Sequence, residues 1–305
     1  MVSIIIPSFN QGQFIEETIR SLILQEYENL EIIVIDGGSD DSTLDVIKKY
    51  ERWLAYWVSE KDSGQANAIN KGLAIARGEI VKWINSDDLL LPGALMELSR
   101  NYLKNKDKFF ISPVEHFLDG SDKCRTFEPK NISRETLVEF WSGKISWNDP
   151  GTFYTREVFN TVGIIDESYR YAFDYDFILR VTEHFEPVYL KKTTARFRVH
   201  SHSKTISEGD KFIYEQAKVS QKHWAELKQV DRLGFERYFA VTMFRNGISS
   251  LRHNPSAAVP YFLQGFKTNI FLSTWWLIRW ALKMVRARVK IGDKNSNDWS
   301  GFGVK

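Results

Sequence analysis

Short apolar runs alternate with amphipathic stretches through the first hundred residues of the chain. Four of the runs are rich in β-branched residues and predict strands, at 3–9, 30–36, 54–60 and 79–85. Between the first two runs, Ile15, Ile19 and Leu22 recur at helical spacing and predict an amphipathic helix. Because the strands are apolar throughout and alternate with helices, we expect an α/β fold with a mostly parallel sheet covered on both faces.

Beyond residue 109 the pattern is less regular. A further strand is predicted at 109–117, and helices are predicted at 131–141 and 177–185. After residue 207 the sequence becomes helical and aromatic, and its last residues have the composition of a flexible tail. We therefore divide the chain into an α/β domain at 1–206, a helical C-terminal extension at 207–292 and a flexible tail at 293–305.

Composition and charge exclude several classes of protein. Hydrophobic residues make up 43% and charged residues 26% of the 305 residues, as in an ordinary globular protein. The 41 basic and 39 acidic residues nearly cancel, which argues against a general nucleic-acid-binding protein. The single cysteine, Cys124, excludes an internal disulfide and fits a reducing compartment.

No segment has the pattern of a signal peptide or a membrane span. The N-terminus lacks a basic region, and its short apolar run predicts a strand. The uncharged stretch 268–278 is well short of the roughly 20 residues that cross a bilayer. We therefore expect a cytoplasmic protein without a transmembrane helix.

Carboxylates follow three of the predicted strands. Asp36 ends the second strand, Asp62 follows the third, and Asp87 and Asp88 follow the fourth. Because ligands of parallel α/β sheets bind beyond the carboxyl ends of the strands, we expect these side chains on one rim. The chain has no P-loop, no Gly-x-Gly-x-x-Gly after the first strand and no Gly-x-Ser-x-Gly elbow, so it lacks the signatures of three common enzyme classes.

The adjacent Asp87 and Asp88 have two interpretations. They would cap a helix that begins near Pro92, because Asp is favoured before a helix. Alternatively, a divalent cation would relieve the repulsion between them. Oxygen ligands select Mg²⁺ or Mn²⁺, which fill their coordination with substrate phosphates, so this interpretation predicts a diphosphate ligand. Asp36 likewise would begin a turn with Gly37, or would accept hydrogen bonds from a base or a ribose.

Four motifs in this order closely resemble the family-2 glycosyltransferases, which have the GT-A fold. They are SIIIPSFNQGQ and EIIVIDGGSDDST within residues 3–43, DSGQANAINKG at 62–72 and WINSDDLLLPGAL at 83–95. The resemblance covers roughly residues 2–205 and implies a Rossmann-like, mostly parallel sheet flanked by helices. It also implies a nucleotide-sugar half at 1–114 and an acceptor half at 115–206.

The resemblance assigns the donor site as well. The residues that would bind the nucleotide sugar are Pro7, Ser8, Phe9, Asp36, Asp62, Gln65, Asn67, Asn70, Lys71 and Asp87. The family's Asp-x-Asp-like element corresponds to Ser86-Asp87-Asp88, in which Asp88 is the preferred ligand of Mn²⁺ or Mg²⁺. Related enzymes place a histidine near the metal or the diphosphate at the position of His200. The neighbouring Ser203 and Lys204 would add phosphate contacts. A histidine that is merely packed or solvated is the alternative.

Residues 148–181 are similar to the family's acceptor region, which ends in a catalytic carboxylate. The usual Glu-Asp pair is Phe173-Asp174 here, so Asp174 corresponds to the general base and Asp176 is the reserve candidate. One base suffices for inversion, because it deprotonates the acceptor hydroxyl while the metal stabilises the leaving diphosphate. The alternative is that both acids only stabilise the N-terminus of the following helix.

The segment 271–290 has a basic stripe at helical spacing, formed by Arg279, Lys283, Arg286 and Lys290. Apolar residues fall on the opposite side, and tryptophans flank the stripe. This pattern is typical of a helix in a membrane interface. It fits equally a helix that packs its apolar face on the catalytic domain and exposes its basic face to water.

We therefore expect an inverting, metal-dependent glycosyltransferase of the hexosyltransferase type. The donor would be a nucleotide-diphosphate sugar, and the acceptor a saccharide or lipid-linked saccharide in surface polysaccharide or glycan biosynthesis. Trp147 and Asn148 would shape the acceptor site or else belong to the core. A lipid-linked acceptor would suit peripheral attachment to the cytoplasmic face of a membrane through 271–290. The alternative is a catalytically degenerate nucleotide-sugar-binding or scaffold module, which Phe173 favours and the aspartates oppose.

Overall fold

The computed structural model describes residues 1–144, 146–200, 203–204, 208–225, 227, 230–251, 255–268, 274 and 278. The chain divides into two compact units. Unit 1 comprises Met1–Val138 and Lys144–Glu226, and unit 2 comprises Glu139–Gly143 and Leu227–Lys305. Unit 1 therefore extends beyond the domain end expected at 206.

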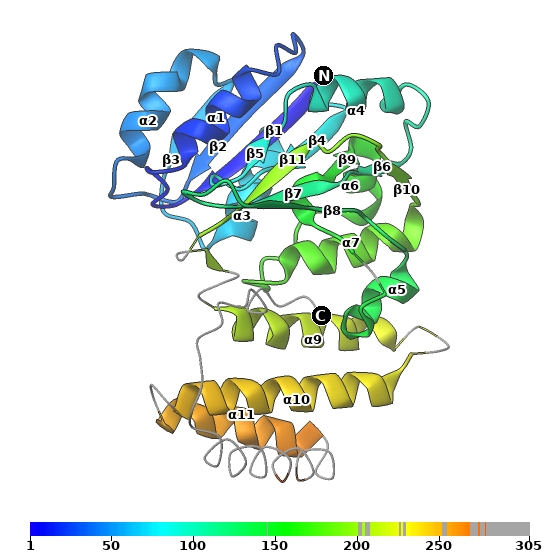
Figure 1. The fold of residues 1–305 in the computed structure, drawn as a ribbon. Helices are drawn as coiled ribbons and strands as arrows, with labels where there is room; N and C mark the ends of the chain where they lie inside the picture. The colour runs from blue at the N-terminus through cyan, green and yellow to red at the C-terminus, as the bar shows by residue number, and fades with distance from the viewer. Residues whose placement is uncertain are drawn as a thin grey trace. The chain divides into compact units, whose positions relative to one another are not determined.

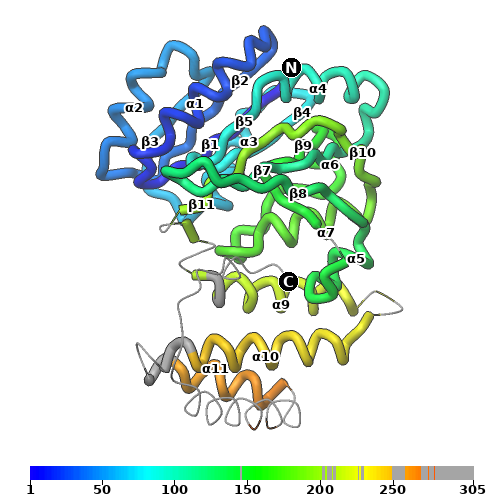
Figure 2. Tube along the Cα trace, in the orientation of Figure 1, coloured from blue at the N-terminus to red at the C-terminus, as the bar shows by residue number. Residues whose placement is uncertain are grey.

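A seven-stranded sheet forms the centre of unit 1 (Figure 1), and the same arrangement can be followed along the Cα trace in Figure 2. The strand order is β10-β6-β9-β4-β1-β2-β3. The strands are β1 (Val2–Ser8), β2 (Leu30–Asp36), β3 (Tyr56–Ser59), β4 (Ile80–Trp83), β6 (Phe109–Ile111), β9 (Thr152–Thr155) and β10 (Pro187–Tyr189). All neighbouring pairs are parallel except those of β9, which is antiparallel to β4 and β6. The predicted mostly parallel sheet is confirmed.

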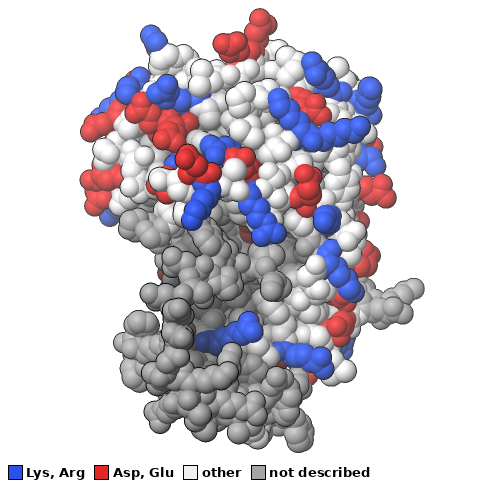
Figure 3. Space-filling view, viewed as in Figure 1, with Lys and Arg blue, Asp and Glu red and all other residues white. Residues whose placement is uncertain are grey.

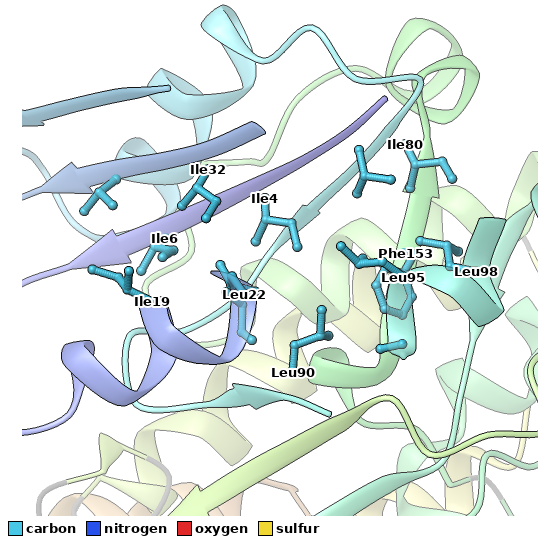
Figure 4. Close-up of a cluster of buried hydrophobic side chains, with 14 of the residues drawn as sticks. Ile4, Ile6, Ile19, Leu22, Ile32, Ile80, Leu90, Leu95, Leu98 and Phe153 are labelled. Atoms are coloured by element: carbon cyan, nitrogen blue, oxygen red, sulfur yellow. The ribbon is translucent and has the colours of Figure 1, made fainter. Parts of the chain in front are cut away.

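Helices cover this sheet on both faces, as predicted. Successive side chains of a strand point in opposite directions, so apolar strands present a surface to bury on each face. Ile4 and Ile6 of β1 enter a buried apolar cluster with Ile19 of α1 (Figure 4). Ile5 faces α3 so closely that a Cβ atom at Gly72 would lie 2.4 Å from its Cγ2 atom. The helices of unit 1 are α1 (Ile15–Ile23), α2 (Thr43–Tyr50), α3 (Gln65–Ile75), α4 (Ala94–Tyr102), α5 (Arg134–Val138), α6 (Arg156–Val162), α7 (Phe173–His184) and α9 (Gly209–Trp224).

Several predicted elements have different bounds in the structure, among them the helix expected at 131–141, which is α5 at Arg134–Val138. The strand expected at 109–117 is broken at Ser112–Pro113, so its halves, β6 and β7, belong to different sheets. The helix expected at 177–185 begins earlier, as α7, so Asp174 and Asp176 lie in its first turn.

A second sheet has the order β5-β11-β7-β8 and lies at the end of β4 that carries the aspartates. Its strands are β5 (Leu89–Leu90), β7 (Val114–Leu118), β8 (Cys124–Phe127) and β11 (Ala195–Val199). β11 pairs with β7 in parallel and with β5 antiparallel. Because β5 directly follows Asp88, this pairing brings the residues after β11 to the rim of the main sheet.

Unit 2 is helical in its described part. Its elements are the short 3-10 helix η2 (Phe140–Ser142), α10 (Arg232–Leu251) and α11 (Pro255–Thr268). Gly247 of α10 allows close contact with α11, because a Cβ atom there would lie 2.9 Å from the Phe262 ring. Phe244 packs on Phe262 as well, with ring centroids 5.4 Å apart.

Of the predicted segment 271–290, the structure describes only Thr274 and Ile278, and the predicted tail 293–305 lies outside the described residues. Among the helices that are described, none is long and apolar enough to cross a membrane.

Candidate active site

The ends of β1 and β2 form one side of the candidate site. Pro7 and Ser8 are buried at the end of β1, whereas the side chain of the next residue, Phe9, is 59% exposed. The hydroxyl oxygen of Ser8 and the amide oxygen of Gln11 are buried, and neither has a hydrogen-bond partner in the described structure. Buried polar atoms usually find a partner, so these two mark a place where a polar ligand would fit.

Asp36 is fully buried at the end of β2 and organises the following turn. Its carboxylate accepts hydrogen bonds from the backbone N–H groups of Gly38 and Ser39, at 3.1 and 2.9 Å. It also accepts bonds from the hydroxyl groups of Ser39 and Ser59, at 2.5 and 2.6 Å. Gly38 has a φ of +83°, a conformation that suits glycine. Asp36 therefore fixes the loop beside the predicted nucleotide position.

The residues predicted around α3 fall into two groups. Asp62 lies against Gly37, because a Cβ atom added at Gly37 would be 2.9 Å from the Oδ2 atom of Asp62. Gln65 donates a hydrogen bond to Asn85 at 2.7 Å and accepts one from Lys204 at 3.1 Å. Both residues are therefore at the rim.

The other three residues predicted in this segment make structural contacts. Asn67 and Asn70 donate hydrogen bonds to Glu167, at 2.9 and 2.7 Å. Asn70 is buried and also exchanges two hydrogen bonds with the backbone of Ile165. Lys71 forms an ion pair with Glu60 at 2.6 Å. In this arrangement they hold neighbouring loops, and their contact with a nucleotide sugar stays a prediction.

The two adjacent aspartates have different environments. Asp88 is fully buried, and its two carboxylate oxygens accept hydrogen bonds from the Arg198 backbone N–H and the Asn85 amide, both at 3.0 Å. Burial, and then the charge of Asp87, raise the pKa of Asp88 well above its ordinary value. Asp87 is partly exposed, and its Oδ2 atom lies 3.1 Å from Nε2 of His200. The structure therefore brings His200 to Asp87, whereas Asp88, the metal ligand preferred from the sequence, is held by Asn85 and Arg198.

Arg198 and Thr18 fix this pair of aspartates in place. Arg198 is 4% exposed, and its side chain donates to the backbone oxygen of Asp87 at 2.9 Å. The same guanidinium forms ion pairs with Glu17 and Asp119. The hydroxyl of Thr18 in α1 bonds the backbone oxygen of Asp88 at 2.8 Å. The turn at the end of β4 is thus held from both α1 and β11.

Two carboxylates, Asp149 and Asp174, lie close enough for their charges to interact. Burial, and then the charge of Asp149, raise the pKa of Asp174 to about 8. Burial also raises the pKa of Asp149 to about 6, although Lys82 and a hydrogen bond from Trp83 oppose the rise. The hydroxyl of Tyr154 is buried near both acids and has no hydrogen-bond partner in the described structure. These groups form a proton-holding cluster at the start of α7.

Asp176, the reserve candidate, is held differently. It is fully buried and forms ion pairs with Arg180 at 2.8 Å and Lys222 at 3.1 Å, and its Oδ1 atom lies 3.3 Å from His223. Burial would raise its pKa, but the hydrogen bonds from these three residues outweigh burial and lower it to about 2. A carboxylate with this pKa is a weak base, whereas Asp174, with a pKa of about 8, is the stronger base of the two.

Glu215 of α9 holds the loop that precedes Asp174. Its carboxylate accepts hydrogen bonds from three successive backbone N–H groups, those of Arg170, Tyr171 and Ala172, at 3.1, 2.6 and 2.9 Å. Ala172 is the residue at the start of α7. The start of α7 is thereby held by a carboxylate from another helix of the same unit.

A buried lysine lies beneath the turn that carries Asp149. Lys82 is 1% exposed, and its ammonium group donates to the backbone oxygens of Pro150 and Thr152 at 2.7 and 3.0 Å. Burial lowers the pKa of Lys82 to about 8, against the attraction of Asp149 and Asp88. The lysine thus ties the acceptor-side turn to β4, the strand that leads to the paired aspartates.

The residues predicted to shape the acceptor site, Trp147 and Asn148, are half-buried beside Asp149. The indole of Trp147 donates to the hydroxyl of Thr152 at 3.0 Å. The amide oxygen of Asn148 lies 2.7 Å from Nε2 of His116. Their polar groups are thus engaged within the protein, so their bearing on an acceptor stays a prediction.

The sequence model described as Glycosyl transferase family 2 matches residues 3–163, just over half of the chain. This chain belongs to glycosyltransferase family 2. The family's expected GT-A fold is also found in the structures that resemble it. The crystal structure of Staphylococcus aureus TarS 1-349 in complex with UDP-GlcNAc has a TM-score of 0.59 at 18% identity, over 83% of this chain and 74% of that one.

The chain is also similar to curated proteins that are named as glycosyltransferases. An uncharacterized glycosyltransferase of Rickettsia typhi is 32% identical over 181 residues, which is 58% of this chain and 57% of that protein. The Staphylococcus aureus poly(ribitol-phosphate) beta-N-acetylglucosaminyltransferase TarP is 32% identical over 146 residues, 45% of this chain and 44% of that protein. The chain thus spans about half the length of these two proteins.

The family match ends before Asp174 and His200, so the sites predicted for these two residues lie outside the matched region. Four residues that support the site were not among those predicted from the sequence, namely Lys82, Asp149, Arg198 and Glu215. Two of them had a signal in the sequence. Lys82 is a charged residue within an apolar strand, and Asp149 precedes Pro-Gly beside the predicted Asn148. Glu215 had none, because its partners are backbone groups of a distant loop.

Proposed function

We propose that this chain transfers a hexose from a nucleotide-diphosphate sugar to a saccharide or lipid-linked saccharide in glycan biosynthesis, with inversion and with a divalent metal. The observation that carries the proposal is the meeting of Asp87 with His200 at the rim of a family-2 fold. The similarity to TarP, a β-N-acetylglucosaminyltransferase by name, supports the reaction class. The structure of TarS with UDP-GlcNAc supports a nucleotide-sugar donor.

The nucleotide would bind over the ends of β1 and β2. The exposed ring of Phe9 offers a flat surface for a base, and the polar atoms of Ser8 and Gln11 that lack partners offer hydrogen bonds. Asp36 and Asp62 would bound the same pocket. Lys204 lies close enough to Asp62 and Asp87 for its charge to interact with both, and it would contact the donor's phosphates.

Asp87 and His200 fit a divalent cation. The Oδ2 atom of Asp87 and the Nε2 atom of His200 lie 3.1 Å apart, so both side chains could hold the same ion. A carboxylate with an imidazole favours Mn²⁺ over Mg²⁺, which prefers oxygen ligands. Among the described residues, no cluster of three such ligands occurs, so the donor's diphosphate would supply further oxygens. When bound, the cation neutralises charge on the leaving diphosphate.

Asp174 would act as the general base. The acceptor hydroxyl oxygen attacks the anomeric carbon, the bond from that carbon to the diphosphate oxygen breaks, and the hydroxyl proton passes to the Asp174 carboxylate. A single displacement of this kind inverts the anomeric centre. A pKa of about 8 makes Asp174 a stronger base than an ordinary aspartate, and the ionised fraction that can accept the proton grows as the pH rises toward 8. The neighbouring Asp149 supports this by raising the pKa of Asp174.

The test is calorimetric titration of the full chain with UDP, GDP and dTDP, each with and without Mn²⁺. We expect one nucleotide class to bind in a Mn²⁺-dependent way, and Asp87→Ala to abolish the dependence. The matched control is Asp107→Ala, because Asp107 is an exposed aspartate outside the site. Binding by none of the three nucleotides would refute the proposal. Binding without turnover of the matching sugar nucleotide would instead support a degenerate binding module.

We place the reaction on the cytoplasmic side of a membrane. The single cysteine, which fits a reducing compartment, supports this placement.

A further inference from the structure

Charge is distributed unevenly along the chain. Residues 237–292 contain nine Lys or Arg residues and no Asp or Glu, whereas the remaining residues hold 32 basic against all 39 acidic ones. On the face of unit 1 seen in Figure 3, side chains of both signs are interspersed. The near-neutral total therefore hides a strongly cationic C-terminal segment, which begins within α10.

The described part of this segment exposes cations together with aliphatic side chains. On α11, Val259 and Leu263 are 54% and 57% exposed, and Lys267, four residues further on, is exposed as well. Residues at this spacing share one face of a helix. On α10, Arg237 and Arg245 are exposed. Exposed aliphatic residues beside cations are what an interface helix presents to a bilayer.

The opposite sides of the two helices are occupied by each other. Ala258 and Gly265 are buried, and a Cβ atom at Gly265 would lie 2.6 Å from the Phe244 ring. The exposed residues of α11 are therefore not needed for its contact with α10. They remain available for a partner of complementary character, which must be anionic and must also accept apolar side chains.

We propose that α10 and α11 bind the surface of a bilayer that contains anionic phospholipids. The charge is predominantly of one sign, because α10 and α11 together contain four Lys or Arg residues and one acidic residue, Glu236. The aliphatic residues favour a bilayer over a soluble polyanion, since only the bilayer can bury Val259 and Leu263. The composition of residues 269–292, with five further cations and three tryptophans, is consistent with this partner. The proposal goes beyond sugar transfer and does not depend on it.

The test is flotation of the full chain with vesicles of phosphatidylcholine alone or mixed with phosphatidylglycerol. We expect binding to the mixed vesicles only, and weaker binding at high salt. Replacing Arg245 and Lys267 together with Gln should weaken binding about 30-fold, because each cation near an anionic surface contributes about 1 kcal/mol. The matched control replaces two exposed cations of unit 1, Lys104 and Lys106, with Gln and should bind as the wild type does.

Three outcomes would overturn the proposal. The first is equal binding to both kinds of vesicle, and the second is an equal loss of vesicle binding in the Lys104 and Lys106 control variant. The third is displacement of the protein from the vesicles by polyphosphate while Leu263→Gln still binds vesicles like the wild type. The last would indicate a polyanion site. UDP titration of the same variants keeps the two proposals separate. A variant that loses vesicle binding but keeps nucleotide binding supports this inference whatever the donor is.

Discussion

Replacing Asp174 with Asn would test whether the raised pKa of Asp174 lowers the stability of the folded protein as the pH rises. The pKa of Asp174 is raised from 3.8 to about 8 by burial and by Asp149. The folded protein therefore keeps a proton that the unfolded chain releases at much lower pH. A carboxyl group of this kind contributes stability that is fully present below pH 3.8 and is lost as the pH rises through 8.

The size of the effect follows from the shift. One pH unit corresponds to about 1.4 kcal/mol, so the loss between pH 5 and pH 8 would be about 4 kcal/mol if Asp174 titrated alone. Asp149 has a pKa of about 6 and takes up part of the change in the same range. Glu215 adds to the rise at Asp174, and Arg180 lies near the same cluster. We therefore expect Asp174→Asn to gain about 2 to 4 kcal/mol over the wild type between pH 5 and pH 8.5.

The assay is urea unfolding followed by tryptophan fluorescence, with linear extrapolation at both pH values. Asp107→Asn is the control, because Asp107 is exposed and its stability difference from the wild type should not vary with pH. The reasoning would be refuted if Asp174→Asn differed from the wild type by the same free energy at both pH values. An active Asp174→Asn enzyme would separately refute its role as the base.

Three further predictions concern groups that support the site. Glu215→Gln should lower kcat about 10- to 100-fold with unchanged nucleotide affinity, because the backbone at the start of α7 loses the carboxylate that fixes it. Steady-state kinetics together with calorimetry would measure both quantities, and Glu157→Gln, at an exposed position, is the control. An equal loss of nucleotide affinity would contradict the prediction. The pKa of Lys82 is about 8 in the folded protein, against an ordinary value of 10.5. The free energy of unfolding of the wild type, measured with urea, should therefore rise by about 2 kcal/mol relative to that of Lys82→Met between pH 8 and pH 9.5. Parallel pH profiles of the two proteins would show that the ammonium group is not held as described. Gly72→Ala should cost about 1 to 3 kcal/mol of stability by thermal unfolding, because its Cβ would overlap Ile5, and Ala74→Ser on the exposed side of α3 should change little.

The sheet and its rim could be predicted from the sequence because they depend on local patterns. Apolar runs gave the strands, and the parallel arrangement then placed Asp36, Asp62 and the paired aspartates at one edge. β9 could not be predicted, since its four residues show no signal for insertion between β4 and β6. The break at Ser112–Pro113 did have a signal, because a proline cannot donate a backbone hydrogen bond within a sheet.

The roles within the site depend on residues that are distant in the sequence. Asp87 and Asp88 look alike along the chain, and only the position of β11 decides which of them is buried. Asp174 and Asp176 differ in the same way, because Lys222 and His223 of α9 surround only Asp176. A motif therefore located the acids, whereas their protonation required the tertiary structure.

The pairing of Asp88 with Arg198 also has a consequence for synthesis on the ribosome. These two residues are 110 positions apart. At about 5 to 20 residues per second, roughly 5 to 20 seconds pass between their additions to the chain. During that interval the nascent β1–β4 region carries two neighbouring acids without the strand that buries one and holds the other. The donor side of the rim is thus encoded early but completed late, and a nascent chain cannot bind its donor in the finished geometry until β11 has emerged.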